Sequence, residues 1–287
     1  MRNCIFVSDL HGHIDRYEKL FNAIIKEKPF AVFIGGDITP SYLLKRKHPD
    51  SIYQNFIPEY LLKEFQKVQD VLKNSYPQIF IILGNDDARA EEDDIFELEK
   101  RGIWYYIHNK KVTLDEYKIF GYSNVPPTPF LLKDWEKYDV SRFTDPGCIP
   151  PTEGFRTVKV PEKDIELSTI KNDLENLTGN EDLLKSIFLF HSPPYDTHLD
   201  RAALDGKTFD HVPLDVYIGS IAIKNFILER QPYITFHGHV HESTRLTGHW
   251  FQKINNTFSF QAAHDGKELS MVSFNLEKPE NAVRILI

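Results

Sequence analysis

The sequence predicts a single α/β domain in which two sheets pack against each other and helices cover their outer faces. Three observations support this prediction. The first third of the chain alternates short apolar runs with amphipathic helical patterns, which indicates right-handed βαβ units and a largely parallel sheet. The last part contains closely spaced patterns typical of antiparallel strands. No repeat or low-complexity linker divides residues 1–287, and this length suffices for a sizeable core.

The first third supplies the alternating elements. Apolar runs predict three buried strands, at residues 3–9, 30–37 and 78–86. Apolar residues at helical spacing predict a helix from Ile14 to Lys28, just before Pro29, and an amphipathic helix over residues 58–75. A short acidic helix follows the third strand and ends at Gly102.

The middle of the chain changes character at residues 125–161, a long insertion rich in proline and aromatic residues. Irregular segments of this length in a compact domain are more often functional than idle. Beyond it we expect one helix with a shared apolar side, formed by Leu167, Ile170, Leu174 and Leu177. The pattern then predicts a strand at 186–196 that runs into a turn, a helix from Ser220 to about Arg230, a strand at 233–241, and antiparallel strands from Thr244 onward.

Composition excludes several classes of function. The formal net charge is −8 and the longest basic block is the KRKH stretch at residues 45–48, so a broad positive surface for duplex nucleic acid is not expected. The two cysteines, Cys4 and Cys148, are too few for a disulfide framework and fit a reducing compartment. No apolar run approaches the roughly 18 residues of a membrane span. We therefore expect a cytoplasmic protein without a membrane anchor.

Polar side chains follow five of the predicted strands at the point where each strand ends. They are Asp9, His11, Asp37, Asn85, His191, His239 and His241. Ligands of open α/β sheets bind at the carboxyl ends of the strands, so we expect these side chains to share one crevice. Carboxylate, imidazole and amide groups together suit first-row divalent metals such as Mn, Fe or Zn. Seven ligands exceed the needs of one tetrahedral ion and fit two ions that share a carboxylate.

The spacing within each motif supports this interpretation. Asp9 and His11 lie two residues apart, so an extended backbone would point both to the same side, and the same holds for His239 and His241. Alternation also makes His237 a rival ligand. Glycines precede the ligands, where a missing Cβ permits tight turns and close backbone approach; they are Gly35, Gly36, Gly84 and Gly238.

The ordered motifs DLH, GGD, GNDD, FHSPP and GHVH resemble those of the calcineurin-like metallophosphoesterase family, from residue 4 to about residue 265. The resemblance implies a four-layer α/β/β/α sandwich of two mixed sheets flanked by helices. Further stretches, HSPPYDTHLDRA, GSIAIKNFILERQP and AAHDG, are similar to a subgroup of bacterial predicted phosphoesterases related to cyclic-nucleotide phosphodiesterase-like proteins.

The resemblance also implies roles for the ligands. Asp9, His11 and His241 would hold one ion, and Asp37 would bridge to the other. The second ion would be held by Asn85, His191 and His239. We expect two divalent ions from the set Mn, Fe, Zn and Ni, with Mn favoured. In the implied reaction a bridging hydroxide attacks the phosphorus of a small phosphoester, for which nucleotide-like compounds are candidates.

One departure from the family pattern concerns Asp86, which stands where the family has a histidine after the asparagine. Two divalent ions, two carboxylates and a hydroxide leave one net positive charge, which an ionised Asp86 would offset. This argument favours phosphodiesters or activated esters over dianionic monoesters. Asp86 would serve as a general acid only if its pKa rose from about 3.9 toward neutrality. His13 and His264, and less directly His198 and His237, are the other candidate acids.

Two other functions compete with this reading. A scaffold with the same fold would use its surface to bind a partner protein, although such members tend to lose ligands and this chain keeps all seven. An amidohydrolase would open with HxH rather than DLH and would need eight βα units. Trp135, Tyr138 and Phe143 are candidates for stacking a nucleobase, but aromatic residues of this kind more often anchor a loop.

Overall fold

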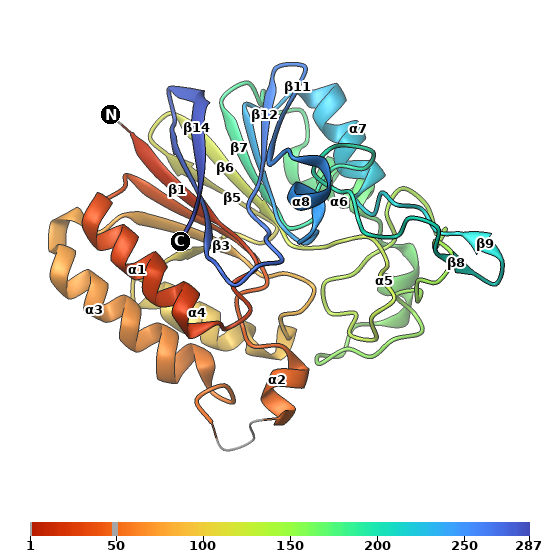
Figure 1. Cartoon of the computed structure of the whole chain (residues 1–287), viewed down its shortest axis with the longest axis horizontal. Coiled ribbons are helices and arrows are strands. Elements are labelled where there is room, and N and C mark those ends of the chain that lie inside the picture. Colours follow the sequence, from red (N-terminus) through yellow and green to blue (C-terminus); the bar gives the residue numbers. More distant parts are fainter. Residues whose placement is uncertain (1, 48–50) are drawn as a thin grey trace.

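The computed structural model describes residues 2–47 and 51–287. Two six-stranded sheets lie face to face in the molecule (Figure 1). The first sheet contains β1 (Asn3–Val7), β2 (Ala31–Gly35), β3 (Gln78–Ile82), β4 (Tyr105–Tyr106), β13 (Ser270–Asn275) and β14 (Lys278–Leu286). The second contains β5 (Lys110–Leu114), β6 (Tyr117–Tyr122), β7 (Ser186–Phe190), β10 (Ile234–His237), β11 (Phe251–Ile254) and β12 (Thr257–Gln261).

Both sheets are mixed, with parallel strands at their centres. In the first sheet β1, β2, β3 and β4 run parallel, and β13 and β14 complete one side in antiparallel pairs. In the second sheet β6, β7, β10 and β12 run parallel, and β5 and β11 are antiparallel edge strands. A separate hairpin of β8 (Thr208–Phe209) and β9 (Val212–Pro213) extends from the body (Figure 1).

Helices cover the outer face of each sheet. α1 (Ile14–Glu27), α3 (Leu62–Leu72) and α4 (Glu92–Lys100) pack on the first sheet, and α6 (Ile170–Thr178) and α7 (Ile221–Arg230) pack on the second (Figure 1). The shorter turns of helix are α2 (Tyr42–Lys47), η1 (Ile57–Leu61), η2 (Lys73–Ser75), η3 (Arg89–Glu91), α5 (Glu162–Leu167) and α8 (Ser243–Thr247). Among the described residues, no helix combines the length and apolar character needed to cross a bilayer.

Three apolar clusters separate the four layers. The central cluster lies between the two sheets and is dominated by aromatic rings, among which Phe6 and Phe236 stack at 4.5 Å between centroids. The outer clusters lie between each sheet and its helices. Burial of these side chains is the main term that stabilises the sandwich. The four-layer α/β/β/α arrangement predicted for the fold class is therefore confirmed.

Several predicted elements end or divide elsewhere. The single helix expected around Leu167 and Ile170 is two helices, because the Thr169 side chain accepts a hydrogen bond from the backbone N–H of Asn172 and starts α6 anew. Leu167 consequently lies on α5 and is exposed. The strand expected at 186–196 stops at Phe190, and β5 and β6 have no counterpart among the predicted elements.

The 125–161 insertion is irregular but firmly attached. Its Lys133 and Glu136 form a fully buried ion pair, with the Nζ and Oε2 atoms 2.5 Å apart. Asp134 accepts hydrogen bonds from the backbone N–H groups of Arg89 and Thr157, which ties the insertion to the loop after β3. Trp135 is buried, as is Tyr138, so both anchor the loop rather than face a ligand. Phe143 is exposed.

Candidate metal centre

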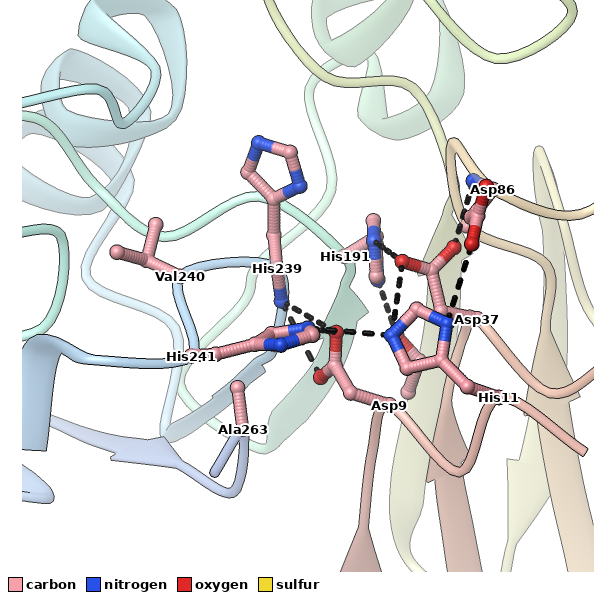
Figure 2. Close-up of polar contacts among 12 residues, drawn as sticks. Asp9, His11, Asp37, Asp86, His191, His239, Val240, His241 and Ala263 are labelled. Atoms are coloured by element: carbon pink, nitrogen blue, oxygen red, sulfur yellow. Dashed lines mark hydrogen bonds and ion pairs between the residues drawn. The ribbon is translucent and has the colours of Figure 1, made fainter. Parts of the chain in front are cut away.

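The predicted ligands follow the carboxyl ends of the parallel strands. Asp9 and His11 come after β1, and Asp37 and Asn85 come after β2 and β3 of the same sheet. The ligands after β7 and β10 of the facing sheet are His191, His239 and His241. Since the parallel strands of the two sheets end on the same side, the loops meet at one place (Figure 2).

Four of these residues form one compact group. Asp9, His11, Asp37 and His241 each offer one ligand atom, and these atoms all lie within 4.8 Å of one another. The Nε2 atoms of His11 and His241 are 3.1 Å apart, and the Nε2 of His241 is 3.1 Å from Asp9 Oδ1. The two imidazole nitrogens face each other beside two carboxylates, so four electron-rich donor atoms converge on one small space. This donor set therefore fits a divalent cation.

A second set lies beside the first and shares Asp37 with it. The Nε2 atom of His191 is 3.3 Å from Asp37 Oδ2 and 3.1 Å from Asn85 Oδ1. The other ring nitrogen, Nδ1, lies 2.8 Å from the carbonyl oxygen of Gly35. A carbonyl only accepts, so Nδ1 carries a proton and Nε2 is the nitrogen that meets the shared carboxylate and is available to a cation. Asp37 thus contacts a histidine of each set, because His11 Nε2 is 3.8 Å from the same Oδ2.

His239 contributes its backbone to this arrangement rather than its ring. Its N–H donates to both carboxylate oxygens of Asp9, at 3.0 and 3.2 Å. Figure 2 shows the ring pointing away from the Asp9 carboxylate, and its centroid is 5.3 Å from that of His191. The compact group of four does not include it.

The backbone at the ligands is not extended, contrary to the prediction for the DLH and GHVH motifs. β1 ends at Val7, and Asp9 and His11 both have positive φ, at 57° and 47°. His239 also has a positive φ, of 69°. Hydrogen bonds hold the first two residues in place, from Asp9 N–H to Gly36 O and from His11 N–H to Asp37 O. Left-handed backbone at non-glycine residues is strained and tends to occur at functional sites.

Glycine is required where the loops touch the carboxylates, as predicted from the sequence. A Cβ at Gly84 would lie 2.3 Å from Asp37 Oδ1, and one at Gly238 would lie 2.5 Å from Asp9 Oδ2. Neither distance is possible for real atoms, so a side chain at either position would displace a carboxylate.

The electrostatics of the cluster favour bound positive charge. Burial opposes ionisation of Asp9, but the hydrogen bond and charge of His241 outweigh it and lower the pKa to about 2. Burial lowers the pKa of His11. The carboxylates of Asp86, Asp37 and Asp9 raise it by more than burial lowers it, so the net value is about 9. Two ionised carboxylates in a buried pocket therefore draw either protons or a metal ion onto the histidines.

Asp87 is a site-forming residue that the sequence analysis did not single out. Its fully buried carboxylate accepts hydrogen bonds from the N–H groups of Ile38, Thr39 and Gly84 and from the Thr39 hydroxyl. Burial, and then the charge of Asp37, raise its pKa to about 7. The contacts join the loops after β2 and β3, which carry Asp37 and Asn85. In the sequence, the only feature that could have pointed to Asp87 is its place as the second acid of the GNDD motif.

The candidate acids lie at different distances from the ligands. Asp86 and His13 line one pocket together with His11 and His241, and Ser41, Leu44 and Lys47 also line it. Asp86 Oδ2 is 3.3 Å from His11 Nδ1, and the Asp86 N–H donates to Asp37 Oδ1 at 2.8 Å. His264 instead contacts Glu268 Oε2 at 3.2 Å.

The two remaining histidines point elsewhere. His237 is fully buried, with Nδ1 2.9 Å from Ser192 O and Nε2 2.8 Å from the Thr235 hydroxyl, so both ring nitrogens are already paired. His198 stacks on His249 at the surface, with 4.4 Å between ring centroids.

Comparison with known proteins identifies the family. Residues 3–243 match the calcineurin-like phosphoesterase family, and the chain belongs to it. No match was found among curated protein sequences.

Solved structures of similar fold match nearly end to end. One is 16% identical, with a TM-score of 0.60 over 99% of this chain and 98% of the other. TT1561 of Thermus thermophilus is 14% identical, with a TM-score of 0.55 over 99% and 98%. A dimetal phosphatase from Danio rerio is 10% identical, with a TM-score of 0.48 over 94% of each chain. At these identities the first two structures show a likeness of fold alone.

Proposed function

We propose that this protein is a hydrolase of small phosphoesters that works with two divalent cations and prefers diesters or activated esters to monoesters. The observation that carries the proposal is the pair of ligand sets joined by Asp37, one of which brings four ligand atoms within 4.8 Å of one another. Family membership supports phosphoesterase activity as the chemistry of this site.

Each side chain has a role in this proposal. Asp9, His11 and His241 hold one cation, and Asp37 lies between the two. Asn85 and His191 hold the other, with His239 as a further ligand once its ring turns inward. Manganese is the favoured metal within the set Mn, Fe, Zn and Ni because the carboxylate and amide oxygens suit it, whereas the imidazoles suit the other three. When bound, two such cations polarise phosphate oxygens and lower the pKa of a water molecule.

The preference for diesters rests on charge at the mouth of the pocket. The Asp86 carboxylate lies beside His11, so it places a negative charge next to the proposed phosphate position. A monoanionic diester is repelled less by this charge than a dianionic monoester. His13 lines the same pocket and remains the candidate for protonating the leaving group, whereas His264 is directed at Glu268.

The test is hydrolysis by the purified, metal-loaded protein. Samples loaded with Mn, Fe, Zn or Ni are assayed against a chromogenic diester and the matching monoester, and bound metal is measured in each. We expect two ions per chain and faster turnover of the diester. Exchange of Asp86 for histidine should shift the rate ratio toward the monoester, and an unchanged ratio would contradict the charge argument. A metal-loaded protein that hydrolyses neither compound would favour the partner-binding scaffold instead.

A further inference from the structure

We propose that Asp86 is a positioning residue, which holds His11 in the tautomer and ring orientation that binds a cation. In this role it does not deliver the proton to the leaving group. The inference rests on the proposed function, since it assumes that His11 is a metal ligand. Its test measures the Nδ1 proton of His11 and the affinity for metal, so the inference can fail independently of any assay of hydrolysis.

The contacts of His11 divide its two ring nitrogens between different partners. Nδ1 lies 3.3 Å from Asp86 Oδ2, on the outer side of the ring. Nε2 faces inward, 3.1 Å from His241 Nε2 and 3.8 Å from Asp37 Oδ2 (Figure 2). A neutral imidazole has one donor and one acceptor nitrogen. A carboxylate at Nδ1 keeps the proton there and leaves the Nε2 lone pair free for the cation.

In the second ligand set a histidine is oriented in the same way, but by a backbone carbonyl instead of a carboxylate. His191 also presents Nε2 to the shared carboxylate, but its Nδ1 is held by the carbonyl oxygen of Gly35 at 2.8 Å. A backbone carbonyl is present whatever the side chain. His11, nearer the surface, has the carboxylate of Asp86 in the equivalent place. The Gly35 carbonyl oxygen therefore fixes the Nδ1 proton of His191, and the Asp86 carboxylate does the same for His11.

Asp86 is itself held firmly enough to orient a ring. Its backbone N–H donates to Asp37 Oδ1 at 2.8 Å, and the adjacent Asp87 carboxylate binds the N–H groups of Gly84 and Ile38. The loop that carries Asp86 is thus fixed to the same carboxylate that joins the two ligand sets. Its acceptor oxygen is occupied by His11, which suits orientation better than proton delivery.

The decisive measurement is the hydrogen-bonded Nδ1 proton of His11. It is sought by proton–nitrogen NMR of the protein loaded with diamagnetic Zn²⁺, and assigned by its loss in His11→Ala. We expect a slowly exchanging Nδ1–H signal in the wild type, its loss in Asp86→Ala, and its retention in Asp86→Asn, whose amide oxygen also accepts. Asp15→Ala is the matched control, because it removes a carboxylate from the exposed start of α1. A signal that persists in Asp86→Ala would overturn the proposal.

Metal affinity gives a second measurement on the wild type and on the Asp86 and Asp15 variants. In a calorimetric titration with Mn²⁺, Asp86→Ala should weaken one of the two binding steps by about 10–100-fold, while Asp86→Asn stays within about threefold of the wild type. Asp15→Ala should bind as the wild type does. Equal weakening by Asp86→Asn and Asp86→Ala would show that charge, not hydrogen-bond acceptance, matters, and would overturn the inference. A wild type that binds no metal would instead refute the proposed function.

Discussion

The two halves of the metal centre hold their histidines in different ways. In the half formed by Asn85 and His191, the ring is completely buried and a main-chain carbonyl fixes its proton. In the half formed by Asp9, His11 and His241, the rings are 17% and 33% exposed and their partners are side chains. The inner half is therefore built into the fold, whereas the outer half depends on particular side chains at the pocket mouth.

This difference shows where the site tolerates variation. Replacing His11 or His241, which are partly exposed, should change the charge and the metal affinity with little effect on packing, whereas Asp9 is fully buried. Replacing an inner side chain disturbs buried packing as well, because the ring of His191 and its neighbours fill space between the sheets. Asp37 belongs to both halves, and it is the residue on which the comparison depends most.

The largest effect is expected for Asp37→Asn. Loss of the shared carboxylate should weaken both metal-binding steps and lower the rate of ester hydrolysis by about a thousandfold or more, several kcal/mol of lost stabilisation. The rate and the metal stoichiometry are measured together, with Asp70→Asn on the exposed side of α3 as the control. If only one binding step changed, the two halves would not share Asp37 and the comparison would break.

A smaller, asymmetric effect is expected for the two histidines of GHVH. His241→Ala removes one of the four converging ligand atoms and should lower the rate about 100-fold, with one metal-binding step weakened. His239→Ala should cost only about 10-fold, because the backbone N–H that binds Asp9 remains. Both variants are titrated with Mn²⁺ and assayed side by side. Equal losses would indicate that the inner half depends on the His239 ring as strongly as the outer half depends on His241.

An effect of a different kind, on stability rather than on the site's activity, is expected in acid and involves His237, which lies behind the inner half. Burial lowers its pKa to about 3, whereas the unfolded chain has the ordinary value of about 6.5. The folded-state pKa is depressed, so this contribution to stability is complete above pH 6.5 and is lost as the pH falls toward 3. Over that window the histidine adds about 1.4 kcal/mol per pH unit to the slope of unfolding free energy.

Urea unfolding of His237→Asn between pH 7 and pH 4 checks this sign and size. Asparagine retains a donor for the carbonyl of Ser192 but does not titrate, so its slope against pH should be shallower by that amount. Other buried groups, such as His108, contribute equally to both proteins and cancel in the difference. If the unfolding free energy fell equally steeply with decreasing pH in both proteins, protonation of His237 would not be a cause of the loss of stability in acid.

Much of the site could be predicted because parallel strands place their carboxyl ends on the same side. Apolar runs ending in Asp9, Asp37 and Asn85 indicated both the strands and the side from which polar groups emerge. The need for glycine next to the ligands could also be predicted, because a carboxylate packed against the backbone leaves no room for a Cβ at Gly84 or Gly238. These inferences need only local patterns and one general rule of sheet topology.

Other features depend on contacts between distant segments. The DLH backbone is left-handed because the β2 loop supplies hydrogen bonds to Asp9 and His11, an arrangement that local propensity disfavours. Two other differences are local: a cap at Thr169 divides the helix before Ile170, and the exposed lysines of β5 hid its strand pattern. Asp86 resembled a proton donor in the sequence, whereas the fold sets it against His11.

The sequence by itself determined the α/β class, the five strands that carry the candidate ligands and the set of polar residues at their ends, because apolar periodicity and strand-end position are local properties of the chain. Only the tertiary structure decided how those residues divide into an outer and an inner half, which ring nitrogen faces Asp37, and why the His239 ring turns away from Asp9. These depend on loops from two sheets packing together, and such packing is a property of the assembled fold.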